Sequence, residues 1–263
     1  MSKSALVCVT HNNCDTLIRC LESVFNNTSA PYHLFLIDNA SSDPTPGLYT
    51  QLPSTATVVR NTANRWWAGG INQGIRLAGD DFDHVFFLND DIEVPKRWLE
   101  RLTNLLDSNP GIGAIGPLNS NPNDWQCYDR VRTEQDIGSL LPAAPEIDRR
   151  DLAAMDALVA GQNDPPGVTI QGMLAFFCTG LRREAVAKVG LLDEAFIMGG
   201  DDDDYCRRLT RAGFDLALAL NTYVLHHGSV SINRMDDGVR AEFKRRNLAR
   251  LAEKYAETSE AGA

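Results

Sequence analysis

The sequence predicts an α/β protein built on a doubly wound, mostly parallel sheet. In the first ~115 residues, short apolar runs rich in β-forming residues alternate four times with segments of helical periodicity. In such sheets a ligand lies beyond the carboxyl ends of the strands. Here the ends at residues 11–12, 38–39 and 89–91 are polar and acidic, where a connecting loop needs only turn chemistry. The length of 263 residues suits one large domain with a sizeable core.

The elements of the first half follow from periodicity and composition. Strand-like runs rich in apolar and β-branched residues are expected at residues 5–9, 33–37, 58–59 and 85–88. A helix is expected from Asp15, with apolar residues at helical spacing, and it closes at residues 26–28. A second helix is expected over residues 69–77.

Residues 119–167 differ from their surroundings because prolines interrupt a polar stretch with one helical pattern, at residues 152–159. We expect an insertion without a core of its own. Ordered structure is expected to resume at residues 173–178. Helices are then expected at 183–189 and 203–211, strands at 216–220 and 223–225, and a basic helix at 239–255. Residues 1–235 would form one domain with parts 1–115, 119–167 and 168–235, followed by the basic helix and frayed tail at 236–263.

Charge and composition exclude several classes. The chain has 25 Lys plus Arg against 35 Asp plus Glu, a net charge of −10, which weighs against nucleic-acid binding. Its apolar runs are too short to span a membrane, and the amino-terminal segment reaches polar residues too soon for a secretion signal, which predicts a cytoplasmic protein. Six dispersed cysteines without a Cys-x-x-Cys pair indicate buried, reduced thiols, although any one of them could be reactive.

The first motif with chemical potential is the apolar strand at 85–88, which ends in Asn89, Asp90 and Asp91. Carboxylates on a rigid strand end suit Mg²⁺ or Mn²⁺ bound together with phosphate oxygens. The alternative is a capping cluster, because Asp and Asn also begin turns and helices.

The second motif is the run of four carboxylates at residues 201–204, between a glycine pair and a helix. One or two acids at a helix amino terminus need no function. Four in succession repel one another, which raises the pKa of at least one member and prepares it to act as a general base. A calcium loop is the alternative, but the run lacks the alternating spacing of such loops.

The third motif spans Asn64 to Gly74, where Trp66 and Trp67 precede Gly69 and Gly70. Two adjacent tryptophans suit a flat base or a sugar, and packing in the core is the alternative for one of them. The glycines are too irregular for a dinucleotide fingerprint, so a helix start beside bound phosphate is the simpler hypothesis. His226, in the late His226-His227 pair, gains a role only if the fold brings it to Asp91.

Taken in order, these pieces resemble the inverting nucleotide-sugar glycosyltransferases of family 2, which have the GT-A fold. The matching segments are residues 7–12, 36–43, 61–74, 88–91, 190–196 and 200–209, together with His226. Within the family the pattern is most similar to the bacterial rhamnosyltransferase-like branch. The resemblance implies a nucleotide-binding half of Rossmann type followed by an acceptor-binding half, with the insertion at residues 119–167 on the acceptor side.

The resemblance also assigns roles to residues. Asp38 would bind the nucleotide base, and Thr10 and Asn12 would lie near the nucleoside. Asp91 would bind Mg²⁺ or Mn²⁺ together with His226, and Asp202 would be the general base, with Asp201 as its competitor. The remaining residues expected on the donor side are Asn64, Trp66, Gly70, Asn89 and Asp90.

The implied reaction transfers a sugar from a UDP- or dTDP-linked donor to an acceptor hydroxyl in one in-line displacement. The implied acceptor is a glycan or a lipid-linked sugar of a bacterial surface polysaccharide or another glycoconjugate. A nucleotidyltransferase is one alternative, but the expected basic glycine-rich triphosphate loop is missing from the sequence. A non-catalytic carbohydrate-binding protein is another, but it has no use for so many clustered acids.

The helix expected at 239–255 carries five basic residues in an acidic chain, with Phe243, Leu248, Leu251 and Tyr255 on another side. A solvated face whose cations pair with nearby acids is one interpretation. The other is peripheral association with the inner face of a membrane, or contact with the phosphate of a lipid-linked acceptor. The basic residues concerned are Arg240, Lys244, Arg245, Arg246 and Arg250.

Overall fold

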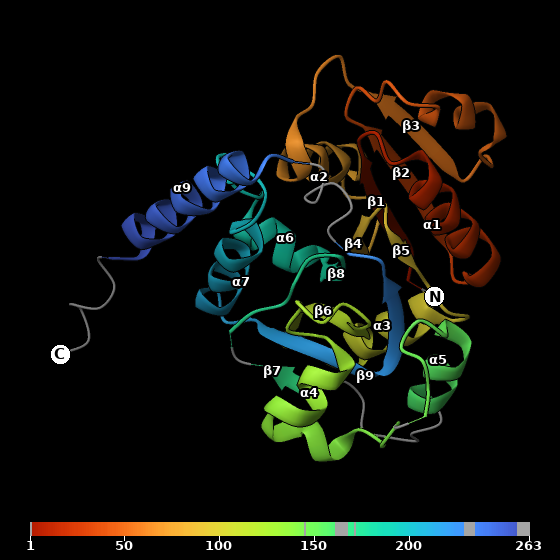
Figure 1. Ribbon diagram of the computed structural model, residues 1–263, viewed down its shortest axis with the longest axis vertical. Helices are drawn as coiled ribbons and strands as arrows, with labels where there is room; N and C mark the ends of the chain where they lie inside the picture. Colours follow the sequence, from red (N-terminus) through yellow and green to blue (C-terminus); the bar gives the residue numbers. More distant parts are fainter. Residues whose placement is uncertain (1, 145, 161–167, 171, 229–234, 257–263) are drawn as a thin grey trace.

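A computed structural model describes residues 2–144, 146–160, 168–170, 172–228 and 235–256, and it confirms the α/β class (Figure 1). The described residues form a nine-stranded sheet with the strand order β3-β2-β1-β4-β8-β6-β9-β5, and β7 pairs with β9. The strands are β1 (Ser4–Thr10), β2 (Tyr32–Asp38), β3 (Ala56–Arg60), β4 (His84–Asn89), β5 (Ile92–Glu93), β6 (Ile112–Asn119), β7 (Val168–Ile170), β8 (Cys178–Arg182) and β9 (Asp215–His226).

The first four strands are parallel to one another, as the sequence predicts. Antiparallel pairing begins where β8 joins β4 and β6, and β6 and β9 then run parallel. The segments expected as separate strands at 216–220 and 223–225 belong to one strand, β9, whose pairing with β6 shifts register at an irregularity. Several elements were not predicted from the sequence, among them the helix α3 and the strands β5, β6 and β7.

Helices cover both faces of the sheet because the buried strands alternate their apolar side chains between the two sides. Leu6 and Cys8 of β1 pack with α1 and α3, whereas Val7 and Val9 pack with α2, α6 and α7. The helical elements are α1 (Cys14–Asn27), η1 (Thr45–Gln51), α2 (Trp66–Ala78), α3 (Trp98–Ser108), α4 (Tyr128–Glu134), η2 (Asp136–Leu140), α5 (Leu152–Ala160), α6 (Arg183–Val189), α7 (Asp201–Arg211) and α9 (Asp237–Ala256).

Helix α2 approaches β1 closely because glycines face the strand. A Cβ atom on Gly70 would lie 2.7 Å from Val9 Cγ1, and one on Gly74 would lie 2.2 Å from Val7 Cγ1. Both distances are shorter than real Cβ contacts, so larger residues would push the helix away from the strand. The packing alone therefore gives Gly70 a structural reason to be glycine.

The region 119–160 shares a hydrophobic cluster with strand β9. Tyr128, Val131, Met155 and Val159 are buried in one cluster with Leu218, Leu220 and Tyr223 of β9. The segment lacks enough apolar residues to form a core alone, but β9 supplies the other half of the cluster. All six cysteines are buried free thiols, as expected.

Helix α9 packs differently from the amphipathic pattern predicted for it. Leu248, expected on the apolar side, is 57% exposed, whereas Asn247 and Tyr255 are buried. The helix lies beside α7 and close to the start of α2, far from α4 and α5 (Figure 1). Within the described ranges, no helix is long and apolar enough to cross a bilayer.

Candidate active site

A cavity of about 580 Å³ lies at the carboxyl ends of β1 and β4. Nine of the eleven predicted site residues line it, and they come from five separate parts of the chain. They are Thr10 and Asn12 at and after the end of β1, Asn64 and Trp66 before and at the start of α2, Asn89, Asp90 and Asp91 at and after the end of β4, Asp202 in the first turn of α7, and His226 at the end of β9. Their convergence follows from parallel pairing, which places successive strand ends at one edge of the sheet.

Asp90 connects the loops that follow β1 and β4. Its carboxylate accepts a hydrogen bond from Thr10 Oγ1 at 2.7 Å and two from Asn13 Nδ2 at 3.1 and 3.2 Å. Burial raises the pKa of Asp90 to about 7, and these hydrogen bonds oppose the rise. The contacts hold the two strand ends in a fixed relation at the cavity.

Asp91 and His226 meet because β5 pairs with the end of β9. In this antiparallel pair Ile92 is opposite His226, and the distance from Asp91 Oδ1 to His226 Nε2 is 3.4 Å. The His226 ring stacks on Phe177, with centroids 4.8 Å apart and an interplanar angle of 17°. The fold thus brings His226 to Asp91, which was the condition for His226 to have a role.

Asp124 is a cavity residue that the sequence analysis did not single out. It comes from the loop between β6 and α4, is buried, and its Oδ2 lies 3.9 Å from His226 Nδ1. Burial raises the pKa of Asp124, and backbone N–H donation from Gln126 opposes that rise. Nothing in its local sequence distinguishes it, since only the fold brings it to His226.

The residues around Asp91 supply donor atoms of the kinds that bind a divalent cation. Asp91 offers a carboxylate, and His226 offers the ring nitrogen Nε2, which lies 3.4 Å from Asp91 Oδ1. The other ring nitrogen, Nδ1, is buried without a hydrogen-bond partner on the side of Asp124. Among the residues with described positions, no group of three His, Cys, Asp or Glu side chains forms a complete metal site. Phosphate oxygens and water would therefore have to supply the other ligands, as they commonly do for Mg²⁺.

Asn89 and Asn12 occupy the wall of the same cavity. Asn89 Nδ2 lies 3.5 Å from His226 Nε2, so the amide is close to the Asp91–His226 pair. Asn12 has a positive φ of 55°, and its side-chain oxygen accepts a hydrogen bond from the N–H of Ser42 at 2.7 Å. Asn12 thereby connects the loop after β1 to the loop after β2.

Two predicted donor-binding residues, Asp38 and Gly70, do not line the cavity. Asp38 is fully buried, and its carboxylate accepts hydrogen bonds from the Ser41 N–H and the Tyr49 hydroxyl and pairs with Arg60. Burial together with the Asp38 contact raises the pKa of the Tyr49 hydroxyl. In this structure Asp38 orders the loop after β2 while Gly70 faces β1, so any contact with the donor remains a prediction for both.

The two tryptophans divide between the core and the neighbouring helix. Trp67 packs against Phe87 and Phe176. This is the core packing that was the alternative expectation for one of the two tryptophans. Trp66 has a positive φ of 61° and meets the Phe243 ring edge-on, with centroids 5.6 Å apart. Both side chains line the cavity, and the side-chain oxygen of Asn64 accepts a hydrogen bond from the Trp66 N–H at 2.8 Å.

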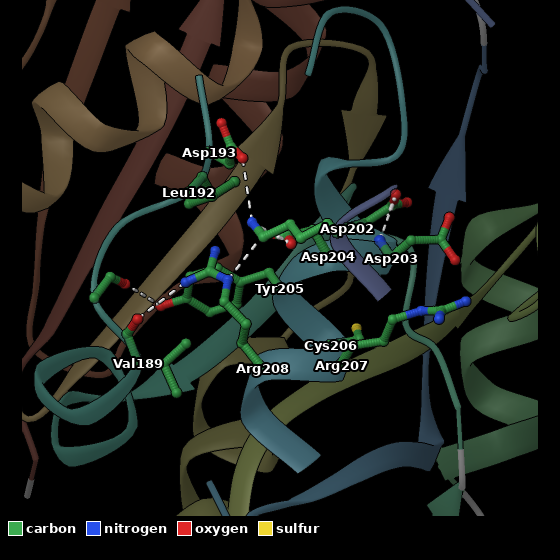
Figure 2. A network of polar contacts seen from close by, with 12 residues as sticks. Val189, Leu192, Asp193, Asp202, Asp203, Asp204, Tyr205, Cys206, Arg207 and Arg208 are labelled. Carbon is green, nitrogen blue, oxygen red and sulfur yellow. Dashed lines mark hydrogen bonds and ion pairs between the residues drawn. The ribbon is translucent and has the colours of Figure 1, made fainter. Parts of the chain in front are cut away.

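The four carboxylates at the start of α7 have different surroundings. Asp204 is fully buried and accepts hydrogen bonds from Arg208 Nε and the Tyr255 hydroxyl, which makes it structural. Figure 2 shows Arg208 continuing toward the Val189 carbonyl, whereas the N–H of Asp203 donates to Asp202. Only the first two acids, Asp201 and Asp202, line the cavity.

Burial is the main reason that the pKa values of Asp201 and Asp202 both rise, and repulsion from neighbouring carboxylates adds to it. Asp201 is almost fully buried, whereas Asp202 is partly exposed. A carboxylate with a raised pKa and access to the cavity suits proton abstraction at neutral pH. This difference in exposure favours Asp202 over its neighbour as the candidate base.

The family model named glycosyl transferase family 2 matches residues 5–190, most of the chain. The chain belongs to this family. Glycosyltransferase family 2 membership confirms the expected enzyme class, and the matched segment includes the strand ends that carry Thr10 and Asp91. The acids at 201–204 and His226 lie beyond the matched residues, so the structure, rather than the match, connects them to the site.

Among curated relatives, this glycosyltransferase is 26% identical over 251 residues to an N-acetylglucosaminyl-diphospho-decaprenol L-rhamnosyltransferase of Mycobacterium tuberculosis. The match covers 87% of this chain and 77% of the relative. The galactofuranosyltransferase GlfT1 of Mycolicibacterium smegmatis is 25% identical over 233 residues, with 86% and 72% covered. These relatives agree with the resemblance to the rhamnosyltransferase-like branch.

Solved glycosyltransferase structures share the fold. The mannosyltransferase PcManGT of Pyrobaculum calidifontis, in complex with GDP-Man and Mn²⁺, has a TM-score of 0.63 at 16% identity, covering 96% of this chain and 64% of that one. GalNAc-T7 with UDP, GalNAc and Mn²⁺ has a TM-score of 0.62 at 20% identity. The match covers 86% of this chain and 44% of that one. The expected GT-A architecture is therefore confirmed.

Proposed function

We propose that this family 2 glycosyltransferase is an inverting, metal-dependent enzyme that moves a sugar from a UDP- or dTDP-linked donor to an acceptor hydroxyl. The observation that carries the proposal is the position of Asp202 in the same cavity as Asp91 and His226. Asp202 would thus serve as the base toward the acceptor, and Asp91 and His226 would serve the diphosphate of the donor, within one cavity. A glycan or lipid-linked acceptor of a bacterial surface polysaccharide is supported by the mycobacterial relatives.

The chemistry follows from charge. Asp202 accepts the proton of the acceptor hydroxyl as the oxygen attacks the anomeric carbon, and no covalent sugar–enzyme intermediate is needed. Mg²⁺ or Mn²⁺ held by Asp91 and His226 would stabilise negative charge on the departing nucleoside diphosphate. Thr10, Asn12, Asn64 and Trp66 line the space for the donor, and Asn89 and Asp90 lie at its metal end.

Nothing in the comparisons favours a nucleotidyltransferase or a non-catalytic sugar-binding protein, since the relatives are glycosyltransferases. We expect UDP or dTDP to raise the melting temperature of the protein more in Mn²⁺ than in EDTA. The matching UDP- or dTDP-sugar should release nucleoside diphosphate when acceptor is added. Release of pyrophosphate, or sugar binding without release, would support one of the other two classes.

Cytoplasmic location with peripheral attachment to an anionic membrane stays a prediction. Several basic residues of α9 have protein partners, because Arg240 pairs with Asp237, Arg245 with Glu242 and Arg250 with Asp193. These contacts support the interpretation in which the cations pair with nearby acids.

If α9 nevertheless binds membranes, replacing Lys244, Arg245 and Arg246 by Glu should weaken sedimentation with anionic vesicles at low salt, at about 1 kcal/mol per residue. Donor hydrolysis should stay unchanged. An unmodified protein that stays in the supernatant would contradict membrane binding and favour a soluble acceptor.

A further inference from the structure

Helix α9 contains one buried amide on an otherwise exposed stretch. Asn247 is 4% exposed, whereas its neighbours Arg246 and Leu248 are exposed. An amide is costly to bury unless its hydrogen-bonding groups find partners. The surroundings of Asn247 therefore indicate why a polar residue occupies this position.

The Asn247 side chain binds the loop that precedes the acidic run. Its Nδ2 donates to the carbonyls of Ile197 at 2.6 Å and Gly199 at 2.7 Å, and its Oδ1 accepts from the Ile197 N–H at 3.4 Å. Both amide protons and the carbonyl oxygen are thus used on the backbone of one short loop. Neither Asp nor Leu of similar size can provide the two donors.

The loop held by Asn247 has an unfavourable backbone. Met198, Gly199 and Gly200 have φ values of 58°, 112° and 85°, three successive residues in the left-handed region. A non-glycine residue such as Met198 costs free energy there and keeps that conformation only when its surroundings impose it. Met198 and Gly199 line the cavity, and Asp201 and Asp202 follow directly. A change in this loop would therefore move the candidate base.

Other contacts fix α9 in position so that Asn247 can act on the loop. Arg250 pairs with Asp193 at 2.7 Å, and the Tyr255 hydroxyl donates to Asp204 Oδ1 at 2.7 Å. Phe243, one turn before Asn247, meets the cavity residue Trp66. The helix thus contacts residues on both sides of the loop at 197–200, which we call the base loop, and it also contacts Trp66 of the cavity wall. Figure 1 shows α9 beside α7 and close to the start of α2.

We propose that Asn247 is a positioning residue that holds residues 197–200 in the conformation that presents Asp202 to the acceptor. This inference rests on the proposed function, because it takes Asp202 as the base. It also assigns the basic helix α9 a role inside the enzyme rather than only on its surface. Asn247 itself does not line the cavity.

The test compares Asn247→Ala and Asn247→Asp with Leu248→Ala, the exposed residue next to it on the same helix. We expect both Asn247 variants to lower kcat about 10- to 100-fold while the KM for the donor changes less than about twofold, since orientation of the base is lost but donor binding is kept. Hydrogen–deuterium exchange of the peptide spanning residues 196–203 should accelerate. Leu248→Ala should match the unmodified enzyme in all three measurements.

Mn²⁺-dependent nucleotide binding by each variant shows that the sheet and the donor site are folded. If the Asn247 variants bind nucleotide but keep their kcat, or if they raise the donor KM and leave kcat unchanged, the proposal is wrong. Asp202→Asn, measured in parallel, separates the two hypotheses. An active Asp202→Asn variant contradicts the assigned base, whereas an inactive one beside fully active Asn247 variants contradicts only the role of Asn247.

Discussion

Replacing Asp202 by Asn should lower turnover by roughly 10²–10⁴-fold, the range typical of losing a general base, while nucleotide binding is kept. Asn has nearly the same shape but cannot accept the acceptor proton. The change leaves the Asp204 contacts with Arg208 and Tyr255 in place, so α7 should keep its position. Steady-state transfer rates and nucleotide titrations on the same preparation measure the two effects.

Asp201→Asn is the matched control, because Asp201 is the adjacent acid on the same turn and also lines the cavity. We expect it to be the milder change, since Asp201 is nearly fully buried. If the Asp202→Asn enzyme is active and the Asp201→Asn enzyme is inactive, Asp201 rather than Asp202 is the general base.

The pH profile gives an independent check on the base. Burial and neighbouring carboxylates raise the pKa of Asp202 above the ordinary Asp value of 3.8. A base works only when deprotonated, so kcat/KM should fall as pH decreases through this raised pKa. The same raised pKa means that the folded state favours the protonated form of Asp202 more than the unfolded state does. The stabilisation of the folded protein by protonated Asp202 is therefore fully present below the unfolded pKa and is lost as pH rises through the folded pKa.

Replacing Asp91 by Ala should abolish metal-dependent nucleotide binding, with a loss of at least about 100-fold in affinity in Mn²⁺. Without a bridging cation, Asp91 and a diphosphate would face each other as like charges in a buried site. Isothermal titration with UDP and dTDP, in Mn²⁺ and in EDTA, measures the effect. Equal affinity of the unmodified protein in the two buffers would contradict a metal requirement.

A suitable control for Asp91→Ala is Glu22→Ala, which removes one acid from the exposed face of α1. The overall charge changes equally in both variants, so a difference in nucleotide affinity must come from the position of the acid. Circular dichroism and melting temperature verify that each variant is folded. Nucleotide affinity that falls equally in both would point to net charge rather than to a metal ligand at Asp91.

Local signals predicted most element positions, and the differences have identifiable causes. Helix α2 begins at Trp66 rather than at the expected Gly69, since the Asn64 side chain binds the first N–H of the helix. Helix α7 begins at Asp201 rather than Asp203, because carboxylates are favourable in a first helical turn. The sequence analysis missed α3 although Trp98, Leu102 and Leu106 have helical spacing and are buried.

The apolar side predicted for α9 was wrong at Leu248 because periodicity assumes an apolar partner surface. Around Asn247 and Arg250, the surface that α9 meets presents the carbonyls of Ile197 and Gly199 and the acid Asp193. Polar Asn247 and basic Arg250 suit that surface better than leucine does. Hydrophobic spacing carries no information about such a partner.

The sequence by itself determined the α/β class, the polar strand ends and the acidic run, because strand composition and loop chemistry are properties of neighbouring residues. The tertiary structure alone decided that His226 meets Asp91, that Asp124 joins them and that Asn247 holds the base loop. It also placed Asp38 and Gly70 outside the cavity wall. Each of these relations depends on strand pairing or helix docking between distant segments, and local sequence does not encode which distant segment will be the partner.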